Sequence, residues 1–225
     1  MARFTKIQVV QSLLDTGMLP LFYHPDIEVT KEVLKACYAG GVKLFEFTNR
    51  GDFAHEVFGE VVKWAAQETP DLMLGVGSVV DAPTTALYIQ LGANFILSPI
   101  LNPEMATVCN RRKIMWSPGC GTVSEISEAE SLGAEIVKVF PGSTLGGPSF
   151  IKAVKGPQPW SMMMPTGGVA PTEENLKAWF EAGAACVGMG SKLFPKDVIA
   201  KGDWEWITRT CKEALAIINK VRSYQ

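Results

Sequence analysis

Histidine is scarce in this 225-residue sequence, which contains only His24 and His55 and no His-x-His or His-Glu-x-x-His cluster. Zinc enzymes hold their metal with closely spaced histidines or cysteines. The sequence therefore argues against a histidine-rich zinc site, although magnesium held by carboxylates stays open. We expect each histidine to be a surface or loop residue.

Closely spaced cysteines are also missing. The five cysteines are scattered and form no Cys-x-x-Cys pair: Cys37, Cys109, Cys120, Cys186 and Cys211. An odd number without close spacing argues against a disulfide framework or a zinc ribbon. We therefore expect a reducing, cytoplasmic compartment.

The sequence has neither an excess of one charge nor a long apolar run. It carries 21 Lys and Arg against 23 Asp and Glu, a net charge of −2, so nothing in its charge favours nucleic acid or an anionic membrane as a partner. No stretch approaches a transmembrane span, and residues 1–11 hold no apolar core of signal-peptide length. No Gly-x-Gly-x-x-Gly fingerprint for a dinucleotide follows the first expected strand.

What the sequence does contain is a repeated alternation of short apolar runs with amphipathic stretches. Eight runs are expected strands: Leu19–Phe22, Lys43–Phe47, Leu72–Val76, Phe95–Ser98, Met115–Pro118, Ile136–Phe140, Met162–Pro165 and Cys186–Gly188. Helical spacing of apolar residues lies between them, for example in Val29–Ala39, Ala54–Gln67, Thr84–Gln90 and Glu173–Glu181. Additional helices are expected at Lys6–Asp15 and Trp204–Arg222.

This alternation predicts an α/β fold with a parallel sheet, and eight units fit a (β/α)8 TIM barrel. No linker or change of composition divides the chain, so residues 1–225 are expected to form a single domain. An open doubly wound sheet would show the same spacing, and the barrel therefore depends on the count of eight strands.

Lys138 is the most informative residue, because it lies inside the apolar, β-branched run Ile136–Phe140. A lysine is rarely buried unless it is paired or has a chemical task. Burial favours the neutral amine, which is a nucleophile able to attack a ketone near neutral pH. The alternative is a structural lysine that reaches solvent or pairs with a carboxylate. This segment alone does not decide between the two.

The second expected strand carries a carboxylate. Strand alternation places Glu46 and Thr48 on one face and two phenylalanines, Phe45 and Phe47, on the other. Because the phenylalanines suit contact with outer helices, Glu46 and Thr48 are expected to face the interior. Glu46 would then suit a general acid and base, or a structural ion pair.

Two glycine-rich strand ends resemble anion-binding loops. Thr166, Gly167 and Gly168 follow the seventh expected strand, and Gly190 and Ser191 follow the eighth. These are the positions where TIM barrels bind phosphate, although glycine-rich turns of no function are the alternative. Arg50 lies just beyond Glu46 and could bind the carboxylate of a substrate. The alternative is a solvated arginine in a loop, with no role in binding.

Taken in order, the strand ends resemble the 2-keto-3-deoxy-6-phosphogluconate (KDPG) and 4-hydroxy-2-oxoglutarate (KHG) aldolase family. The resemblance covers residues 19–207. It rests on an ordered set of short motifs: Glu46-Phe47-Thr48-Asn49-Arg50, Gly75-Val76-Gly77-Ser78, Phe95-Ile96-Leu97-Ser98-Pro99, Pro118 to Glu125, Lys138-Val139-Phe140-Pro141, Gly146-Gly147, Pro165-Thr166-Gly167-Gly168 and Gly190-Ser191.

The resemblance implies a class I aldolase, a lyase that needs no metal or other cofactor because Lys138 forms a Schiff base with its substrate. By it, Glu46 moves protons, and the remaining site residues fall into three groups: Arg50, Ser78 and Thr48 for the substrate carboxylate; Thr166, Gly167, Gly168, Gly190 and Ser191 for the phosphate; and Pro99 and Phe140 as pocket walls. It also implies a small-molecule substrate, a phosphorylated 2-keto-3-deoxy sugar acid of the Entner–Doudoroff pathway, and a homotrimer.

Several positions depart from the family pattern. Ser78 stands where threonine is usual, and Ile100 stands where glycine is common. The first strand ends in Tyr23 and His24 rather than with an arginine, and residues 142–144 replace a common Ala-Glu pair. These departures leave open whether the substrate is KDPG, its galactonate epimer or KHG.

Two other functions fit parts of the sequence. A phosphate-binding barrel that acts as a sugar-phosphate isomerase or synthase would explain the glycine-rich loops, but it leaves Lys138 without a task. A non-catalytic barrel that serves as a binding subunit would make the coincidence of Lys138 and Glu46 accidental.

Overall fold

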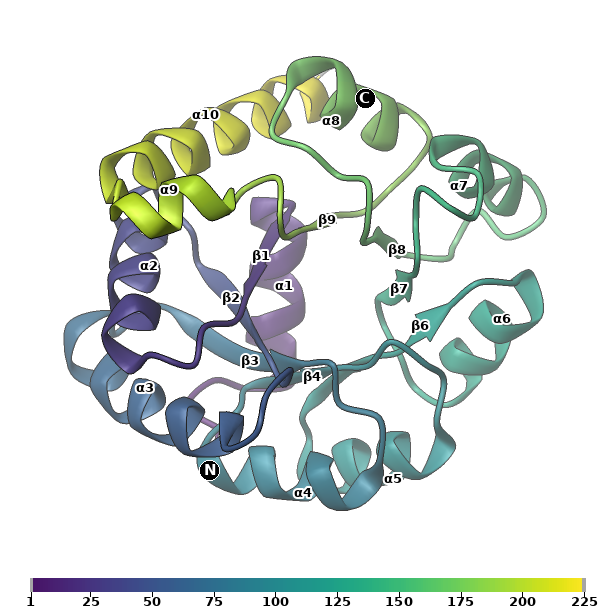
Figure 1. Cartoon of the computed structure of the whole chain (residues 1–225). Helices are drawn as coiled ribbons and strands as arrows, with labels where there is room; N and C mark the ends of the chain where they lie inside the picture. The colour runs from purple at the N-terminus through teal and green to yellow at the C-terminus, as the bar shows by residue number, and fades with distance from the viewer. Residues whose placement is uncertain (1, 224–225) are drawn as a thin grey trace.

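The structure is a computed structural model that describes residues 2–223, in which strands and helices alternate (Figure 1). The strands are β1 Met18–Phe22, β2 Leu44–Thr48, β3 Met73–Gly77, β4 Phe95–Leu97, β5 Met115–Ser117, β6 Gly119–Cys120, β7 Val137–Val139, β8 Met163–Pro165 and β9 Val187–Met189. The helices are α1 Lys6–Thr16, α2 Ile27–Ala39, α3 Ala54–Glu68, α4 Ala82–Leu91, α5 Pro103–Arg112, α6 Val123–Ser131, α7 Pro148–Lys155, α8 Glu173–Glu181, α9 Lys196–Lys201 and α10 Trp204–Arg222. None of the helices formed by residues 2–223 is long and apolar enough to cross a membrane.

The expected elements are present with ends that differ by at most two residues, except for one strand that is divided. The predicted strand Met115–Pro118 is wrong in its extent, because the structure divides this segment into β5 and β6 on either side of Pro118. Proline has no N–H group to contribute to a strand ladder, so the chain changes partners there. β5 pairs with β4, whereas β6 pairs with β7.

All the strand pairs are parallel, which confirms the predicted α/β architecture. The strands form a six-stranded sheet in the order β5-β4-β3-β2-β1-β9 and a three-stranded sheet in the order β6-β7-β8. A single parallel bridge between Thr166 and Gly188 joins the end of β8 to β9. The first strand, β1, therefore pairs directly with the last, β9, and the sheet curls.

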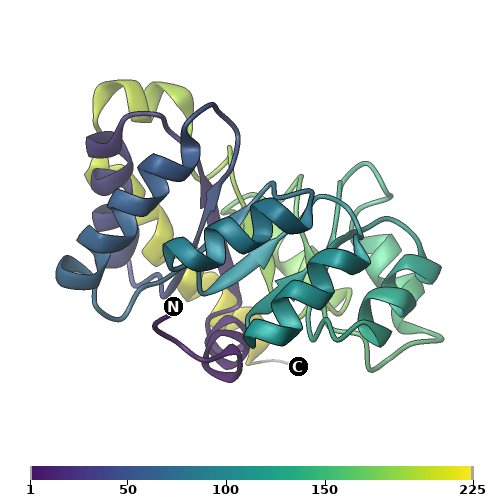
Figure 2. The same ribbon diagram turned by 90° about the horizontal axis from the view of Figure 1, so that it is seen from below.

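Apolar side chains fill the space that the curled strands enclose. Residues of every part of the sheet contribute to this inner cluster, namely Leu19, Leu44, Phe95, Leu97, Met115, Ile136, Met164 and Cys186, with Met73 partly buried beside them. Val9 and Leu13 of α1 pack against the same cluster, so α1 covers one end of the enclosed space. In Figure 2 α1 lies at one end of the molecule and α9 at the other. The enclosed space is thus filled at the α1 end.

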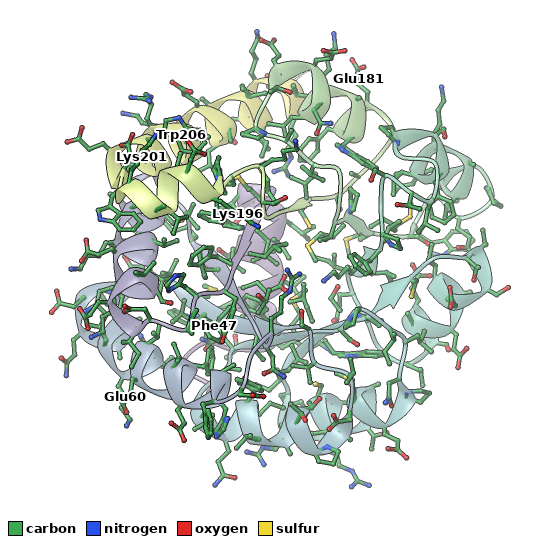
Figure 3. All side chains as sticks on the ribbon, in the orientation of Figure 1. Phe47, Glu60, Glu181, Lys196, Lys201 and Trp206 are labelled. Atoms are coloured by element: carbon green, nitrogen blue, oxygen red, sulfur yellow. The ribbon has the colours of Figure 1, made fainter. Side chains whose placement is uncertain are left out.

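A second, larger core lies between the strands and the outer helices. Phe45 and Phe47 of β2 belong to it, and Figure 3 shows Phe47 between the strands and helices α2 and α3. Leu44 belongs instead to the inner cluster. Because side chains alternate along a strand, Glu46 and Thr48 share the inner face with Leu44, as the sequence predicts.

Candidate active site

Lys138 is held on the inner face of β7. Its neighbours Val137 and Val139 pack in the outer core, whereas Ile136 belongs to the inner cluster. Alternation therefore directs Lys138 inward, one layer beyond Ile136. Only 5% of the residue is exposed, and its Nζ lies 5.3 Å from the centre of the Phe140 ring. The aromatic face is a favourable neighbour for an ammonium group.

Glu46 lies on the inner face of β2 and is 1% exposed. Burial raises the pKa of its carboxyl above the ordinary value, and the positive charges of Lys138 and Arg50 oppose that rise. Its Oε2 atom has no hydrogen-bond partner among the described residues. A buried carboxyl with a raised pKa and a free oxygen is suited to exchanging a proton with a bound molecule.

Gly77 of β3 makes room for the Glu46 carboxyl. A Cβ atom added to Gly77 would lie 1.6 Å from Glu46 Oε1 and 2.3 Å from its Cδ. No side chain at position 77 can therefore coexist with the observed carboxyl. Our sequence reasoning did not single out Gly77 as a site residue, although it belongs to the Gly75-Val76-Gly77-Ser78 motif.

The substitution Gly77→Ala is expected to lower activity by displacing the Glu46 carboxyl. A misplacement of about 1 Å at a reacting group can reduce the rate by about 10²-fold. The measurement is kcat with thermal unfolding alongside. Gly156→Ala serves as the control, because its Cβ would meet nothing closer than 3.4 Å. Equal kcat values for the two variants would contradict the requirement for space beside Glu46.

The three residues expected to bind a carboxylate lie at the ends of β2 and β3. Thr48 is 1% exposed, and its Oγ1 has no hydrogen-bond partner in the described chain. Arg50 is exposed, and its Nε approaches Ser78 Oγ at 3.5 Å. Ser78 has a φ of 59°, a left-handed conformation that is uncommon outside glycine. The structure thus brings Arg50 and Ser78 together at the rim and leaves Thr48 below them.

The expected wall residue Pro99 lies against the strand that pairs with β7. A Cβ added to Gly119 of β6 would lie 2.4 Å from the Pro99 carbonyl oxygen, and Gly119 is the register partner of Lys138. Pro99 is half-buried at this position. Together with Phe140, it borders the place where the Lys138 side chain leaves its strand.

The ends of β8 and β9 offer unpaired backbone donors. The N–H groups of Gly168 and Ser191 donate to no acceptor among the described residues, and Gly167 lies between Gly168 and the bridge that joins Thr166 to Gly188. Thr166 is 5% exposed, and its Oγ1 lies unpartnered against Gly188, where an added Cβ would be 2.3 Å away. Free N–H groups around a small hydroxyl suit an anion.

Unpartnered buried polar atoms gather at this end of the strands. Besides Glu46 Oε2, Thr48 Oγ1 and Thr166 Oγ1, they include Ser117 Oγ of β5. Ser117 lies in the expected strand Met115–Pro118 and was not predicted to be a site residue, and the structure shows that it is fully buried. Buried polar groups are normally hydrogen-bonded, so a cluster of exceptions indicates a site where a polar molecule binds.

Within residues 2–223, no three His, Cys, Asp or Glu side chains come together as possible metal ligands. The chemistry that the described side chains can provide is that of an amine nucleophile, a proton carrier and anion donors. Lys138 and Glu46 lie inside the curled sheet, whereas Arg50 and Ser191 lie exposed at its rim. This separation suits a small molecule with a carbonyl group at the centre and anionic groups toward the outside.

Comparison with known proteins gives a consistent family. A family model described as KDPG and KHG aldolase matches residues 9–210. The 2-dehydro-3-deoxy-phosphogluconate aldolase of Pseudoalteromonas atlantica is 34% identical over 199 residues, which cover 88% of this chain and 90% of that protein.

Two solved structures are similar in fold and in sequence. The KDPG aldolase of Legionella pneumophila, with pyruvate captured at low pH as a covalent carbinolamine intermediate, has a TM-score of 0.82 and 27% identity, covering 90% of this chain and 96% of that one. The 2-keto-3-deoxy-6-phosphogluconate aldolase of Zymomonas mobilis with 3-phosphoglycerate has a TM-score of 0.80 and 27% identity, covering 93% and 95%.

Proposed function

The chain belongs to the KDPG and KHG aldolase family, and we propose that it is a class I aldolase that cleaves KDPG to pyruvate and glyceraldehyde 3-phosphate. KHG, which would give pyruvate and glyoxylate, is the expected weaker substrate. The observation that carries the proposal is the burial of Lys138 and Glu46 on the inner faces of β7 and β2. The reaction requires only these two groups to do chemistry.

In the proposed mechanism the neutral amine of Lys138 attacks the C2 ketone. Water then leaves the carbinolamine with a proton from Glu46, and a protonated imine forms. Glu46 removes the proton of the C4 hydroxyl, the C3–C4 bond breaks, and its electron pair moves into the imine to form an enamine. Glu46 returns a proton to C3, and water releases pyruvate from Lys138. The free Oε2 atom of Glu46 supports this role.

The roles proposed for the other residues follow the polarity of the site. Arg50, Ser78 and Thr48 would hold the carboxylate next to the ketone, since a guanidinium and two hydroxyls are suitable donors for it. Pro99 and Phe140 would border the pyruvyl group. No cofactor is proposed, because the protonated imine on Lys138 is the electron sink.

We further propose that the strands form one closed (β/α)8 barrel and that residues 1–225 make up one domain. The bridge between Thr166 and Gly188 and the inner cluster drawn from all parts of the sheet support closure. A cytoplasmic homotrimer is proposed with it. Sedimentation of the purified protein would test the trimer.

Phosphorylated substrates are expected to be cleaved far more efficiently than KHG. The N–H groups of Gly168 and Ser191, beside Gly167 and with the hydroxyl groups of Thr166 and Ser191, are suited to a phosphate dianion. Binding energy from the remote phosphate can be used at the reacting carbons, so the advantage should appear in kcat/KM. The measurement is a retro-aldol assay that couples pyruvate release to lactate dehydrogenase.

Ser191→Ala should reduce kcat/KM for the phosphorylated substrate alone, by about 1–3 kcal/mol if one charged hydrogen bond is lost. Thr144→Ala, which removes an exposed hydroxyl from the loop after β7 instead of the loop after β9, is the matched control. Equal losses with KDPG and KHG would show that Ser191 does not bind phosphate, even if the aldolase activity stands.

The two alternative functions are not favoured by the comparisons. A sugar-phosphate isomerase or synthase would form no adduct with pyruvate, and neither would a non-catalytic binding subunit. Reduction with borohydride in the presence of pyruvate separates these cases, because only the aldolase gains a stable pyruvyl adduct.

A further inference from the structure

Arg50 is exposed, yet the backbone on both sides of it is held by hydrogen bonds. On the amino side, the Asn49 N–H donates to the Gly77 carbonyl oxygen at 2.8 Å, which extends the pairing of β2 with β3 by one residue. On the carboxyl side, the Ala54 N–H donates to the Gly51 carbonyl oxygen at 3.2 Å. The direction of the Arg50 side chain therefore depends on how residues 49 and 51 are fixed.

Tyr88 of α4 fixes the Asn49 side chain. Its hydroxyl donates to Asn49 Oδ1 at 2.8 Å, across 39 residues of sequence, and Tyr88 is 1% exposed. Burial raises the pKa of Tyr88 to about 12, with the nearby Tyr23 adding to the rise. The hydroxyl thus keeps the proton that it donates at any physiological pH.

Tyr23 fixes the other side of Arg50. A Cβ added to Gly51 would lie 2.1 Å from the Tyr23 hydroxyl oxygen and 2.8 Å from its Cζ, so the Gly51 backbone lies directly against this ring. Tyr23 follows β1 and is half-buried. Only glycine at position 51 allows this approach.

An aromatic row connects the two tyrosines. The Tyr23 and Phe47 rings are 5.5 Å apart, those of Phe47 and Phe58 are 5.7 Å apart, and those of Phe58 and Tyr88 are 5.3 Å apart. Phe47 and Phe58 are fully buried. Packed aromatic rings of this kind have few alternative arrangements, so the two tyrosines hold fixed positions relative to β2.

From these contacts we propose that Tyr88 and Tyr23 are positioning residues, which hold Asn49 and Gly51 so that Arg50 presents its guanidinium to the substrate carboxylate. Nothing in the sequence indicates a role for Tyr88, and Tyr23 stands out there only as part of the altered end of the first strand. The inference rests on the proposed function, because it concerns the carboxylate that Arg50 would bind. It predicts that these residues control affinity for the carboxylate and leave the amine chemistry of Lys138 unchanged.

The test compares two ketones that differ in the carboxylate. Pyruvate has one and acetone does not, and each forms an imine with a reactive lysine that cyanoborohydride reduces to a stable adduct. Intact-mass measurement gives the concentration of ketone that half-saturates labelling. Tyr88→Phe keeps the ring and removes only the hydroxyl. The loss of one hydrogen bond should raise the half-saturating concentration of pyruvate by roughly 3–10-fold and leave that of acetone unchanged.

Steady-state kinetics provide a second readout. Tyr88→Phe should raise KM for the phosphorylated substrate while kcat stays within about two-fold, as expected when binding is weakened without loss of chemistry. Asn49→Ala removes the acceptor of the same hydrogen bond, since Asn49 is the half-buried partner of Tyr88, and it should raise KM to the same extent. The double variant should be no worse than Asn49→Ala alone, because both changes remove one interaction.

Tyr38→Phe of α2 is the matched control, since Tyr38 contacts Lys43, 5.7 Å from its ring centre, and not the Arg50 segment. It should leave both ketones unaffected. Gly51→Ala should raise the half-saturating concentration of pyruvate, and Tyr23→Leu in that background should recover part of the loss by making room for the new Cβ.

Equal shifts for pyruvate and acetone, or none for either, would overturn the positioning role while leaving the aldolase function in place. A wild-type protein that forms no adduct with pyruvate would overturn the proposed function and the inference together. Thermal unfolding of every variant identifies any that are merely destabilised, and Tyr88→Phe and Asn49→Ala must then agree for the inference to stand.

Discussion

Lys138→Met is expected to abolish cleavage of KDPG, with a loss on the order of 10⁴-fold or more, because removal of the nucleophile in covalent catalysis leaves only binding effects. Methionine has similar bulk and no amine, so the inner face of β7 keeps its packing. The fold should persist, and the unfolding temperature should not fall, because Lys138 is 5% exposed and an uncharged side chain is easier to bury there. Pyruvate release and thermal unfolding are the two measurements.

Peptide mapping after reduction with pyruvate should place the adduct on Lys138. Lys152→Met of α7, which replaces an exposed lysine, is the matched control and should keep both activity and labelling. An adduct on Lys152, or full activity in Lys138→Met, would sink the proposed mechanism.

The alternation of strands and helices could be predicted from the sequence because strands and helices have different apolar periods. The inward direction of Lys138 and Glu46 could be predicted for the same reason. Each lies between residues that belong to the outer core, valines in β7 and phenylalanines in β2. A period of two then leaves only one face for the charged residue.

The contacts made by these residues could not be predicted, because they depend on strand register. Gly77 faces the Glu46 carboxyl only because β3 pairs with β2 so that Thr48 lies opposite Gly77. A glycine in the sequence shows that a side chain is missing, but it does not show which neighbouring group occupies the space. The hydrogen bond of Tyr88 to Asn49 joins residues 39 positions apart and has no local pattern at all.

Local chemistry also explains where an expected strand differs from the observed one. The strand predicted to end at Pro118 splits there, because the β-branched and aromatic residues before it favour a strand but proline cannot continue the ladder. Ser117, next to it, is buried with an unpartnered hydroxyl, although serine before proline is typical of an exposed turn. Tertiary packing overrides the turn preference at this position.

Glu46→Gln is expected to lower turnover by roughly 10²–10⁴-fold, the usual contribution of a general acid and base. Glutamine keeps the shape of the side chain and the space beside Gly77, but it cannot carry a proton. Exchange of the pyruvate methyl hydrogens with deuterium should slow as well, because enamine formation requires the same base. Glu56→Gln of α3, an exposed carboxylate, is the control. Normal exchange in Glu46→Gln would assign the proton transfer to another group.

The same variant tests the pKa of Glu46 through stability. Burial raises that pKa above 4.5, so the native protein binds this proton more tightly than the unfolded chain does. The protonated Glu46 therefore contributes to the free energy of unfolding. This contribution is complete below the pKa of Glu46 in the unfolded chain and is lost as pH rises through its pKa in the native protein. Glutamine does not ionise. The unfolding temperature of Glu46→Gln, relative to that of the wild type, should therefore rise as pH increases from the unfolded to the native pKa of Glu46. If the difference shrank instead, the charge of Lys138 would outweigh burial, and Glu46 would be an ionised partner of Lys138 rather than a proton carrier.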